Sequence, residues 1–330
     1  MSTQTASQSH YFDSIAVVGE LIRQRDLSPV ELVTSCLERI NELQSRLNAF
    51  ITVAPESALS AAKAAETEIQ QGQWKGPLHG VPIGIEDFYD TARMRTTAGF
   101  EHFRDRIPKK DATAVEKLKR AGAIVIGKTN MHTLGMGTTG LESAFGPVRN
   151  PRNVDYIAGG SSSGSAAAVA SGMCFATLDT DAIGSCRLPA SCCGIVGFKG
   201  TYGLISPSGI LDGEKDPGEM TRWFNHPGIM ARRVQDVAIV LDVLAERSQK
   251  ESAGYLGAMR KDVNLRVGVT NNFEADHEVR QAFHVAVEKI HALGYSTFSA
   301  QAPLRHPAND VTRIETDRNG SQVDRRRGIS

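Results

Sequence analysis

Hydrophobic and polar residues follow two different periods along the chain, and together they predict both helices and short strands. Short apolar runs bounded by turn residues indicate strands within 76–85, 123–126, 175–178, 192–198, 265–269 and 295–299. Apolar residues spaced three or four positions apart, or runs of strong helix formers, indicate helices at 14–25, 28–43, 57–71, 112–121, 165–173, 234–246 and 278–293. Because helix and strand follow one another at this spacing, the pattern favours an α/β protein.

The clearest local signal is a helix start near residue 28. Ser28 stands at the N-cap position, Pro29 follows at the first helical position, and Glu31 is spaced to close a capping box. We therefore expect the helix that follows to begin at Pro29.

Three other regions lack a regular pattern. Residues 134–160 are rich in glycine and proline, and a loop of that length is usually functional or disordered. Residues 1–10 are polar and predict a disordered terminus. Residues 301–330 contain few large apolar side chains and predict a disordered tail.

The composition excludes several classes of function. Lys+Arg and Asp+Glu both number 37, so the net charge is zero and gives no reason to expect a nucleic acid or an anionic membrane as partner. Residues 1–10 are polar and lack an apolar core, so we expect no signal peptide, and no run approaches the roughly 18 apolar residues of a spanning helix. We therefore expect a cytoplasmic protein with reduced thiols at all five cysteines, namely Cys36, Cys174, Cys186, Cys192 and Cys193.

Metal chemistry also has little support from the sequence. The nine histidines are scattered, and none forms the spacing of a zinc hydrolase. We predict neither a metal nor a cofactor.

The stretch from Gly159 to Arg187 carries the candidate chemistry. Ser161 and Ser185 both lie in turns that contain glycine, where backbone N–H groups are exposed beside a hydroxyl. Acyl transfer needs that combination, a nucleophile with donors for the developing oxyanion. A flexible linker is an alternative interpretation, but the small apolar helix after Gly164 argues against it. A phosphate-binding loop is weaker still, because no Gly-Lys-Ser/Thr follows.

A serine nucleophile also needs a base, and the pattern alone does not supply one. His79, His132 and His226 are isolated, and each fits a surface or core role better than a catalytic one. Lys128 lies in a predicted turn, and for it we favour a structural hydrogen-bonding role.

At these residues the chain resembles the amidase signature family, serine hydrolases that cleave carboxamide C–N bonds. The resemblance covers about residues 12–300, and together its motifs are highly specific. The motifs are Gly159-Gly160-Ser161-Ser162-Ser163-Gly164-Ser165, Gly184-Ser185-Cys186-Arg187-Leu188-Pro189-Ala190, Gly80-Val81-Pro82-Ile83, Gly127-Lys128-Thr129-Asn130, Asn150-Pro151 and Cys193-Gly194-Ile195-Val196-Gly197-Phe198-Lys199.

The resemblance implies a fold. It implies an α/β fold in a single domain, with a mixed sheet covered by helices on both faces. That domain would occupy residues 11–300 and would be incomplete at its C-terminal end, because the chain is shorter than is usual in the family.

The resemblance also implies the roles of individual residues. Ser185 falls on the nucleophile, and Ser161 falls on a bridging serine that the family holds at a cis peptide bond. The backbone N–H groups of the oxyanion hole would come from Ala182, Ile183, Gly184 and Ser185. Gly135 falls on a loop position that, with Ser161, lines the substrate site.

The chain departs from the family pattern at the base. The family carries Lys-Asp where this chain carries Glu86-Asp87, and the lysine acts as base through the bridging serine. An unperturbed glutamate has a pKa of about 4.3 and is a poor base for a serine, although burial raises such a pKa.

A second departure concerns Ile183, a β-branched residue in place of glycine in the oxyanion hole. It stands in the segment Asp179-Thr180-Asp181-Ala182-Ile183-Gly184-Ser185, where the family usually has Gly-Thr-Asp-Thr-Gly-Gly-Ser.

The resemblance therefore implies a hydrolase that cleaves a small-molecule amide through a serine nucleophile, impaired because Glu86 replaces the lysine base. One alternative is an inactive pseudoenzyme or binding subunit that retains the fold. Another is a glutamine amidohydrolase subunit of a tRNA-dependent amidotransferase, so the expected partners range from a homodimer to an amidotransferase-type complex. If Glu86 is the obstacle, Glu86→Lys should restore some amide hydrolysis.

Overall fold

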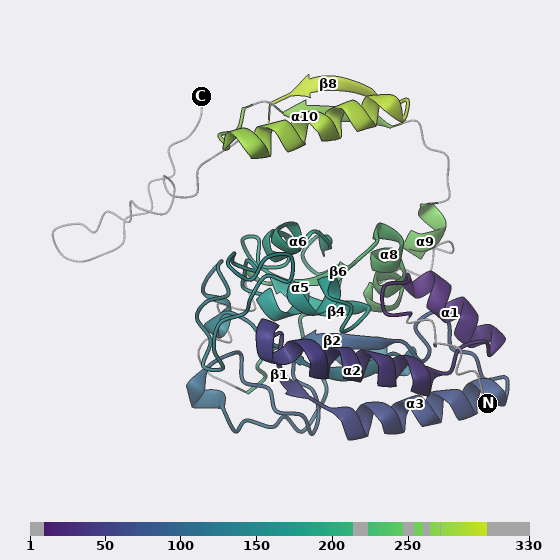
Figure 1. Cartoon of the computed structure of the whole chain (residues 1–330). Helices are drawn as coiled ribbons and strands as arrows, with labels where there is room; N and C mark the ends of the chain where they lie inside the picture. The colour runs from purple at the N-terminus through teal and green to yellow at the C-terminus, as the bar shows by residue number, and fades with distance from the viewer. Residues whose placement is uncertain (1–9, 214–223, 247–253, 260–264, 271, 302–330) are drawn as a thin grey trace, which may run out of the picture. The chain divides into compact units, whose positions relative to one another are not determined.

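The structure, a computed structural model, describes residues 10–213, 224–246, 254–259, 265–270 and 272–301 (Figure 1). The chain divides into two compact units, Met1–Arg260 and Lys261–Ser330. The predicted disordered segments, 1–10 and 301–330, lie almost entirely outside the described residues.

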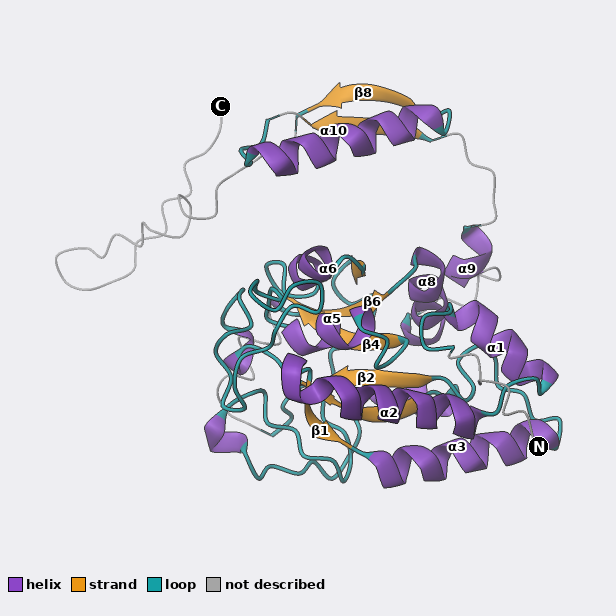
Figure 2. Ribbon diagram, in the orientation of Figure 1, coloured by secondary structure: helices purple, strands orange, loops and turns teal. Residues whose placement is uncertain are grey.

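A mixed six-stranded sheet forms the centre of the first unit (Figure 2). Three adjacent strands are parallel, and each of the other strands pairs with its neighbour in antiparallel register. The mixed α/β fold expected from the sequence is thereby confirmed. In spatial order the strands are β1 (Phe50–Val53), β3 (Ile124–Thr129), β2 (Pro82–Glu86), β4 (Ala176–Asp181), β6 (His226–Ala231) and β5 (Val196–Lys199).

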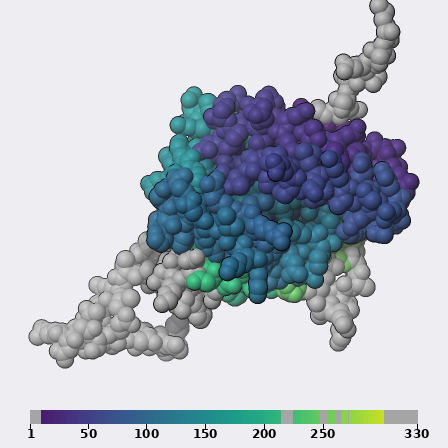
Figure 3. Space-filling model, turned by 90° about the horizontal axis from the view of Figure 1, so that it is seen from below, coloured from purple at the N-terminus to yellow at the C-terminus, as the bar shows by residue number. Residues whose placement is uncertain are grey.

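Helices pack against this sheet and bury its apolar side chains. Helix α5 (Ser163–Ala170) contacts the central strands, and α8 (Val234–Leu244) contacts β4, β5 and β6. In the space-filling view from below, purple and blue residues from the N-terminal part of the chain cover most of the visible face (Figure 3). The other helices that the structure describes in this unit are α1 (Ile15–Gln24), α2 (Pro29–Leu47), α3 (Pro55–Gln70), α4 (Thr113–Arg120), α6 (Arg187–Cys193) and α9 (Gly254–Ala258), with 3₁₀ turns at Glu101–Phe103 and Thr133–Gly135.

The predicted start of α2 is confirmed in atomic detail. The Ser28 hydroxyl accepts hydrogen bonds from the backbone N–H groups of Val30 at 3.0 Å and Glu31 at 3.4 Å. In return, the Glu31 carboxylate accepts the N–H of Ser28 at 3.2 Å. Three backbone N–H groups at the start of the helix are satisfied by this exchange.

The prediction of a strand over 192–198 is wrong in its first half. Cys192 and Cys193 belong to helix α6, which ends at Gly194 in the left-handed conformation with φ of 70°, and β5 begins only at Val196. Apolar residues on both sides of a helix end give one continuous apolar run, which cannot be told from a strand by periodicity. The prediction of a turn at Lys128 is wrong as well, because this residue lies inside β3.

The second unit contains a parallel pair of strands joined by a helix. Strand β7 (Arg266–Thr270) pairs with β8 (Ser296–Ala300), and α10 (His277–Ala292) connects them, as the sequence predicts. Among the described helices, none has the length and apolar character needed to cross a membrane.

Candidate active site

The two candidate serines come together at one edge of the sheet. Strand β4 ends at Asp181 and leads into the turn that carries Ser185, while Ser161 lies one residue before Ser162, the N-cap of α5. The backbone N–H of Ser162 donates to the Ser185 carbonyl at 3.1 Å, which joins the two turns. The peptide bond between Gly160 and Ser161 is cis, as the family resemblance implies.

The loop before this site approaches Ser161 closely. Gly135 has a φ of +70°, and a Cβ atom at this position would lie 3.7 Å from the Ser161 hydroxyl and only 2.8 Å from the Phe88 ring. A side chain at position 135 would therefore be strained and would collide with Phe88. The role of Gly135 in lining the substrate site stays a prediction.

A single carboxylate organises the turn that carries Ser185. Asp181 accepts the backbone N–H of Gly184 at 2.8 Å and that of Cys186 at 3.2 Å, and the Arg187 guanidinium donates to it at 2.9 Å. Burial opposes ionisation of Asp181, but the hydrogen bonds from Arg187 prevail and lower its pKa. Of the predicted oxyanion-hole donors, the N–H of Gly184 is thus already engaged within the turn.

A cavity of about 410 Å³ opens in front of Ser185. Its walls are mainly apolar, and Ile183 contributes a side chain that is 84% exposed. The β-branched residue therefore stands at the open wall of the cavity and not in the core. The remaining described residues that line it are Leu134, Gly135, Met136, Gly137, Thr138, Ala182, Phe224 and Asn225.

Glu86 lies at the C-terminal end of β2, fully buried beneath the serines. The Ser162 hydroxyl donates to its Oε1 at 2.5 Å, and the Thr180 hydroxyl donates to its Oε2 at 2.7 Å. The bridging candidate Ser161 is different, because its buried hydroxyl has no hydrogen-bond partner among the described residues. Glu86 therefore lies at the site, but its hydrogen bond is with Ser162 and not with Ser161.

The charge state of Glu86 is also unusual. Burial, and secondly the neighbouring carboxyl of Asp179, raise the pKa of Glu86 to about 8. Burial likewise raises the pKa of Asp179. No signal in the sequence indicated Asp179, Thr180 or Ser162 as neighbours of Glu86. The pairing of β2 with β4 brings Asp179 and Thr180 there, and the turn before α5 brings Ser162.

Lys128 has the structural role that its sequence context favoured. Its buried ammonium group donates to the Tyr89 carbonyl and to the hydroxyls of Thr91 and Thr96, the last two at 3.2 Å. Lys128 pairs with Ile85 in the sheet, so its side chain leaves the opposite face from Glu86. It is therefore not a substitute base at the serines.

The isolated histidines also have local partners. The ring of His79 pairs with Glu68 at 2.9 Å, and that of His226 contacts the Phe224 carbonyl at 3.1 Å. The contact between His132 and Ser161 is a backbone hydrogen bond, in which the N–H of His132 donates to the Ser161 carbonyl at 2.9 Å. These contacts agree with the predicted structural roles.

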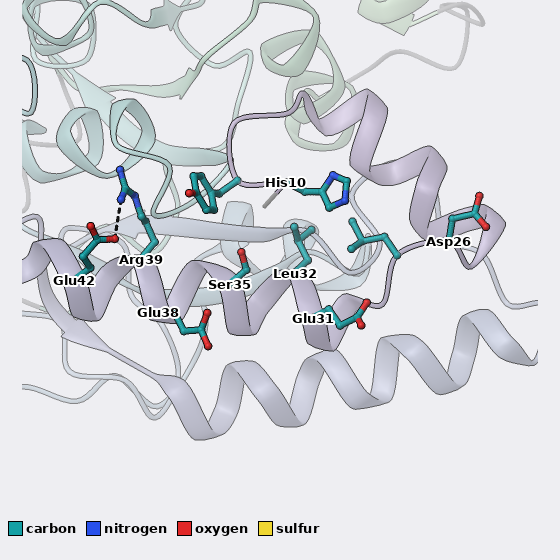
Figure 4. A pocket seen from close by; sticks show the side chains of 10 residues that line it. His10, Asp26, Glu31, Leu32, Ser35, Glu38, Arg39 and Glu42 are labelled. Carbon is teal, nitrogen blue, oxygen red and sulfur yellow. Dashed lines mark hydrogen bonds and ion pairs between the residues drawn. The ribbon is translucent and has the colours of Figure 1, made fainter. Parts of the chain in front are cut away.

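A second hollow of about 450 Å³ lies along α2 (Figure 4). Acidic side chains dominate it, and Arg39 forms an ion pair with Glu42 at 2.7 Å. It contains none of the residues of the serine turns, so we place the candidate active site at the smaller cavity. Its lining residues are His10, Tyr11, Asp26, Leu27, Glu31, Leu32, Ser35, Glu38, Arg39 and Glu42.

Comparisons with known proteins agree on the relatives of this chain. It is 38% identical to a glutamyl-tRNA(Gln) amidotransferase subunit of Geobacter metallireducens, over 85% of this chain and 59% of the relative. It is 42% identical to a mitochondrial glutamyl-tRNA(Gln) amidotransferase subunit of Ixodes scapularis, over 68% of this chain and 44% of the relative. A crystal structure of an amidase superposes with a TM-score of 0.78 at 35% identity, covering 89% of this chain and 64% of that one.

The chain spans less than two thirds of the length of each of these relatives. The family model for amidases matches residues 31–328, which include both serine turns and Glu86. This match, with the shared sequence and fold, shows that the chain belongs to the amidase signature family.

Proposed function

We propose that this chain retains the amide-binding site of its family but hydrolyses amides at a severely reduced rate. In the proposed scheme, Ser185 is the nucleophile and Ser161 is the bridging hydroxyl. The turn 182–185 supplies the oxyanion hole, and Glu86 occupies the position of the base without performing its role.

One observation carries this proposal. The carboxylate of Glu86 accepts hydrogen bonds from Ser162 and Thr180, while the hydroxyl of Ser161 has no hydrogen-bond partner among the described residues. A base must reach the proton that it removes, directly or through a hydrogen-bonded chain. A proton leaving Ser185 through Ser161 therefore finds no hydrogen-bonded path to Glu86.

The protonation of Glu86 weakens it further as a base. A carboxylate whose pKa is raised to about 8 is intrinsically more basic than an ordinary glutamate. At neutral pH, however, most of it already carries a proton and cannot accept another. The position of its hydrogen bonds and its protonation thus both reduce turnover.

A second candidate function is hydrolysis of glutamine within an amidotransferase-type complex. The names of the similar curated proteins favour it, since both relatives described above are subunits of glutamyl-tRNA(Gln) amidotransferases. In that case the protein would act in the cytoplasm as one component of an assembly. An inactive protein that retains this fold would also be able to bind as that subunit of the assembly.

The cavity gives a reason to test apolar amides beside glutamine. The described walls around Ser185 carry Leu134, Met136, Ile183 and Phe224, and no charged side chain among the described lining residues. Glutamine presents an ammonium and a carboxylate, which bind best beside groups of opposite charge. The described walls therefore suit an uncharged acyl group better.

Ammonia release from a panel of primary amides tests the proposed function. The panel contains glutamine, hexanamide and benzamide, with Ser185→Ala as the control for background. We expect wild type to exceed this control by no more than about tenfold, because general-base catalysis worth about 10²–10⁴-fold is missing. Turnover that exceeds the control by several thousandfold on any of these amides would refute severe impairment.

A further inference from the structure

A second buried carboxyl group lies beside Glu86. Strands β2 and β4 are parallel, with Gly84 opposite Thr177 and Ile85 opposite Leu178. The next step in this register brings Glu86 beside Asp179, and both side chains leave the same face of the sheet. Neither residue is exposed to solvent.

No cation among the described residues compensates the charge of Asp179. Its Oδ2 accepts the Thr177 hydroxyl at 2.6 Å, while its Oδ1 has no hydrogen-bond partner among the described residues. The Ser165 hydroxyl and the Met230 amide also favour its charged form, but burial outweighs them and raises its pKa. Two buried carboxyl groups side by side therefore disfavour full ionisation of both.

The other titratable groups around Glu86 do not change this picture. Tyr89 and Cys186 are buried, and each has a raised pKa, for which burial is the first cause. They are neutral at physiological pH. Lys128 is close enough for the charge of Glu86 to act on it, and burial lowers the pKa of Lys128 to about 8. Its side chain nevertheless leaves the opposite face of the sheet, where Tyr89, Thr91 and Thr96 accept its hydrogen bonds.

We propose that Asp179 is a positioning residue that fixes the protonation state of whatever side chain stands at position 86. This inference rests on the proposed function. Beside Glu86, Asp179 favours a protonated carboxyl. Beside a lysine at position 86, it would favour the ammonium form, because an opposite charge stabilises the charged state.

The consequence is that Glu86→Lys alone does not rebuild the base. In the family mechanism, a neutral lysine takes the proton that leaves Ser185 Oγ by way of Ser161, as the Ser185 Oγ–carbonyl bond forms. The lysine then returns that proton to the nitrogen as the C–N bond breaks, and water later hydrolyses the acyl-serine. A lysine held as an ammonium by Asp179 cannot accept the first proton. The family pattern itself has glycine at position 179.

The test compares Glu86→Lys with Glu86→Lys/Asp179→Gly and Glu86→Lys/Asp179→Asn. Asparagine keeps the size of Asp179 and its contact with Thr177, so it controls for lost packing, and Asp179→Asn alone controls for folding. Circular dichroism verifies the fold of each variant. Ammonia release from the amide panel is then recorded from pH 6 to pH 10.

We expect both double variants to exceed Glu86→Lys by at least about tenfold at pH 7.5. We also expect the rise of kcat/KM with pH to occur at least about one pH unit lower in the double variants. Equal rates and equal pH profiles would overturn the role of Asp179 and leave the proposed function standing. If no variant turns over any amide, Asp179 is not the obstacle and the inference fails. Brisk turnover by wild type refutes the proposed function instead.

Discussion

Replacing Lys128 with methionine is expected to lower the free energy of unfolding by about 3 kcal/mol. The ammonium group satisfies the Tyr89 carbonyl and the hydroxyls of Thr91 and Thr96, and it lies near the buried carboxylate of Asp87. Methionine fills a similar volume but cannot donate. The change would leave buried acceptors unpaired and would remove a cation that stabilises the buried carboxylate of Asp87.

Urea unfolding at pH 7, followed by circular dichroism, measures this effect. The matched control is Lys119→Met, because Lys119 forms its ion pair with Asp111 at the surface, where its side chain is 38% exposed. Such pairs contribute at most about 1 kcal/mol. If the two variants lose the same small amount of stability, the network around Lys128 does not stabilise the fold.

Replacing Glu86 with glutamine is expected to stabilise the protein at pH 8 by about 2 kcal/mol. The folded pKa of Glu86 is raised from about 4.5 to about 8, so the native state holds an extra proton between these values. The stability that this proton provides is complete below about pH 4.5 and is lost as the pH rises to about 8. Glutamine keeps hydrogen bonds to Ser162 and Thr180 but does not titrate.

Unfolding free energies at pH 5 and pH 8 test this prediction in wild type and Glu86→Gln. Wild type should lose more stability over this interval than the variant does. The control is Glu142→Gln. The side chain of Glu142 is 82% exposed, so this substitution should leave the pH dependence of the unfolding free energy unchanged. If the unfolding free energies of wild type and Glu86→Gln change equally between pH 5 and pH 8, the pKa of Glu86 is not raised and the prediction is wrong.

The regular elements were predictable from the sequence wherever local signals agreed. The capping residues at Ser28 and Glu31 determined the start of α2, and strong periodicity located α8 and α10. The short strands β1 and β6 escaped prediction. Such strands carry little local signal, and their pairing with distant partners defines them.

The site was predictable only in part, and for a similar reason. The resemblance identified Ser161, Ser185 and Glu86, and the structure brings all three together. No local pattern tells which of two consecutive serines faces Glu86, because that depends on the backbone path through Ser161 and Ser162. Asp179 became a neighbour of Glu86 only through the register of two strands far apart in sequence.

The most direct test of the account is whether Ser161 carries a proton for Ser185. A fluorophosphonate forms a bond from phosphorus to Ser185 Oγ with loss of fluoride, and its second-order labelling rate reports how readily that hydroxyl is deprotonated. Wild type and Ser161→Ala are compared at pH 7.5, with Ser185→Ala to verify the labelled residue.

Since Glu86 bonds to Ser162 and the Ser161 hydroxyl has no described partner, we predict that Ser161→Ala is labelled within about threefold of the wild-type rate. A loss of about 100-fold or more in Ser161→Ala would show a working relay through Ser161 and would contradict the account.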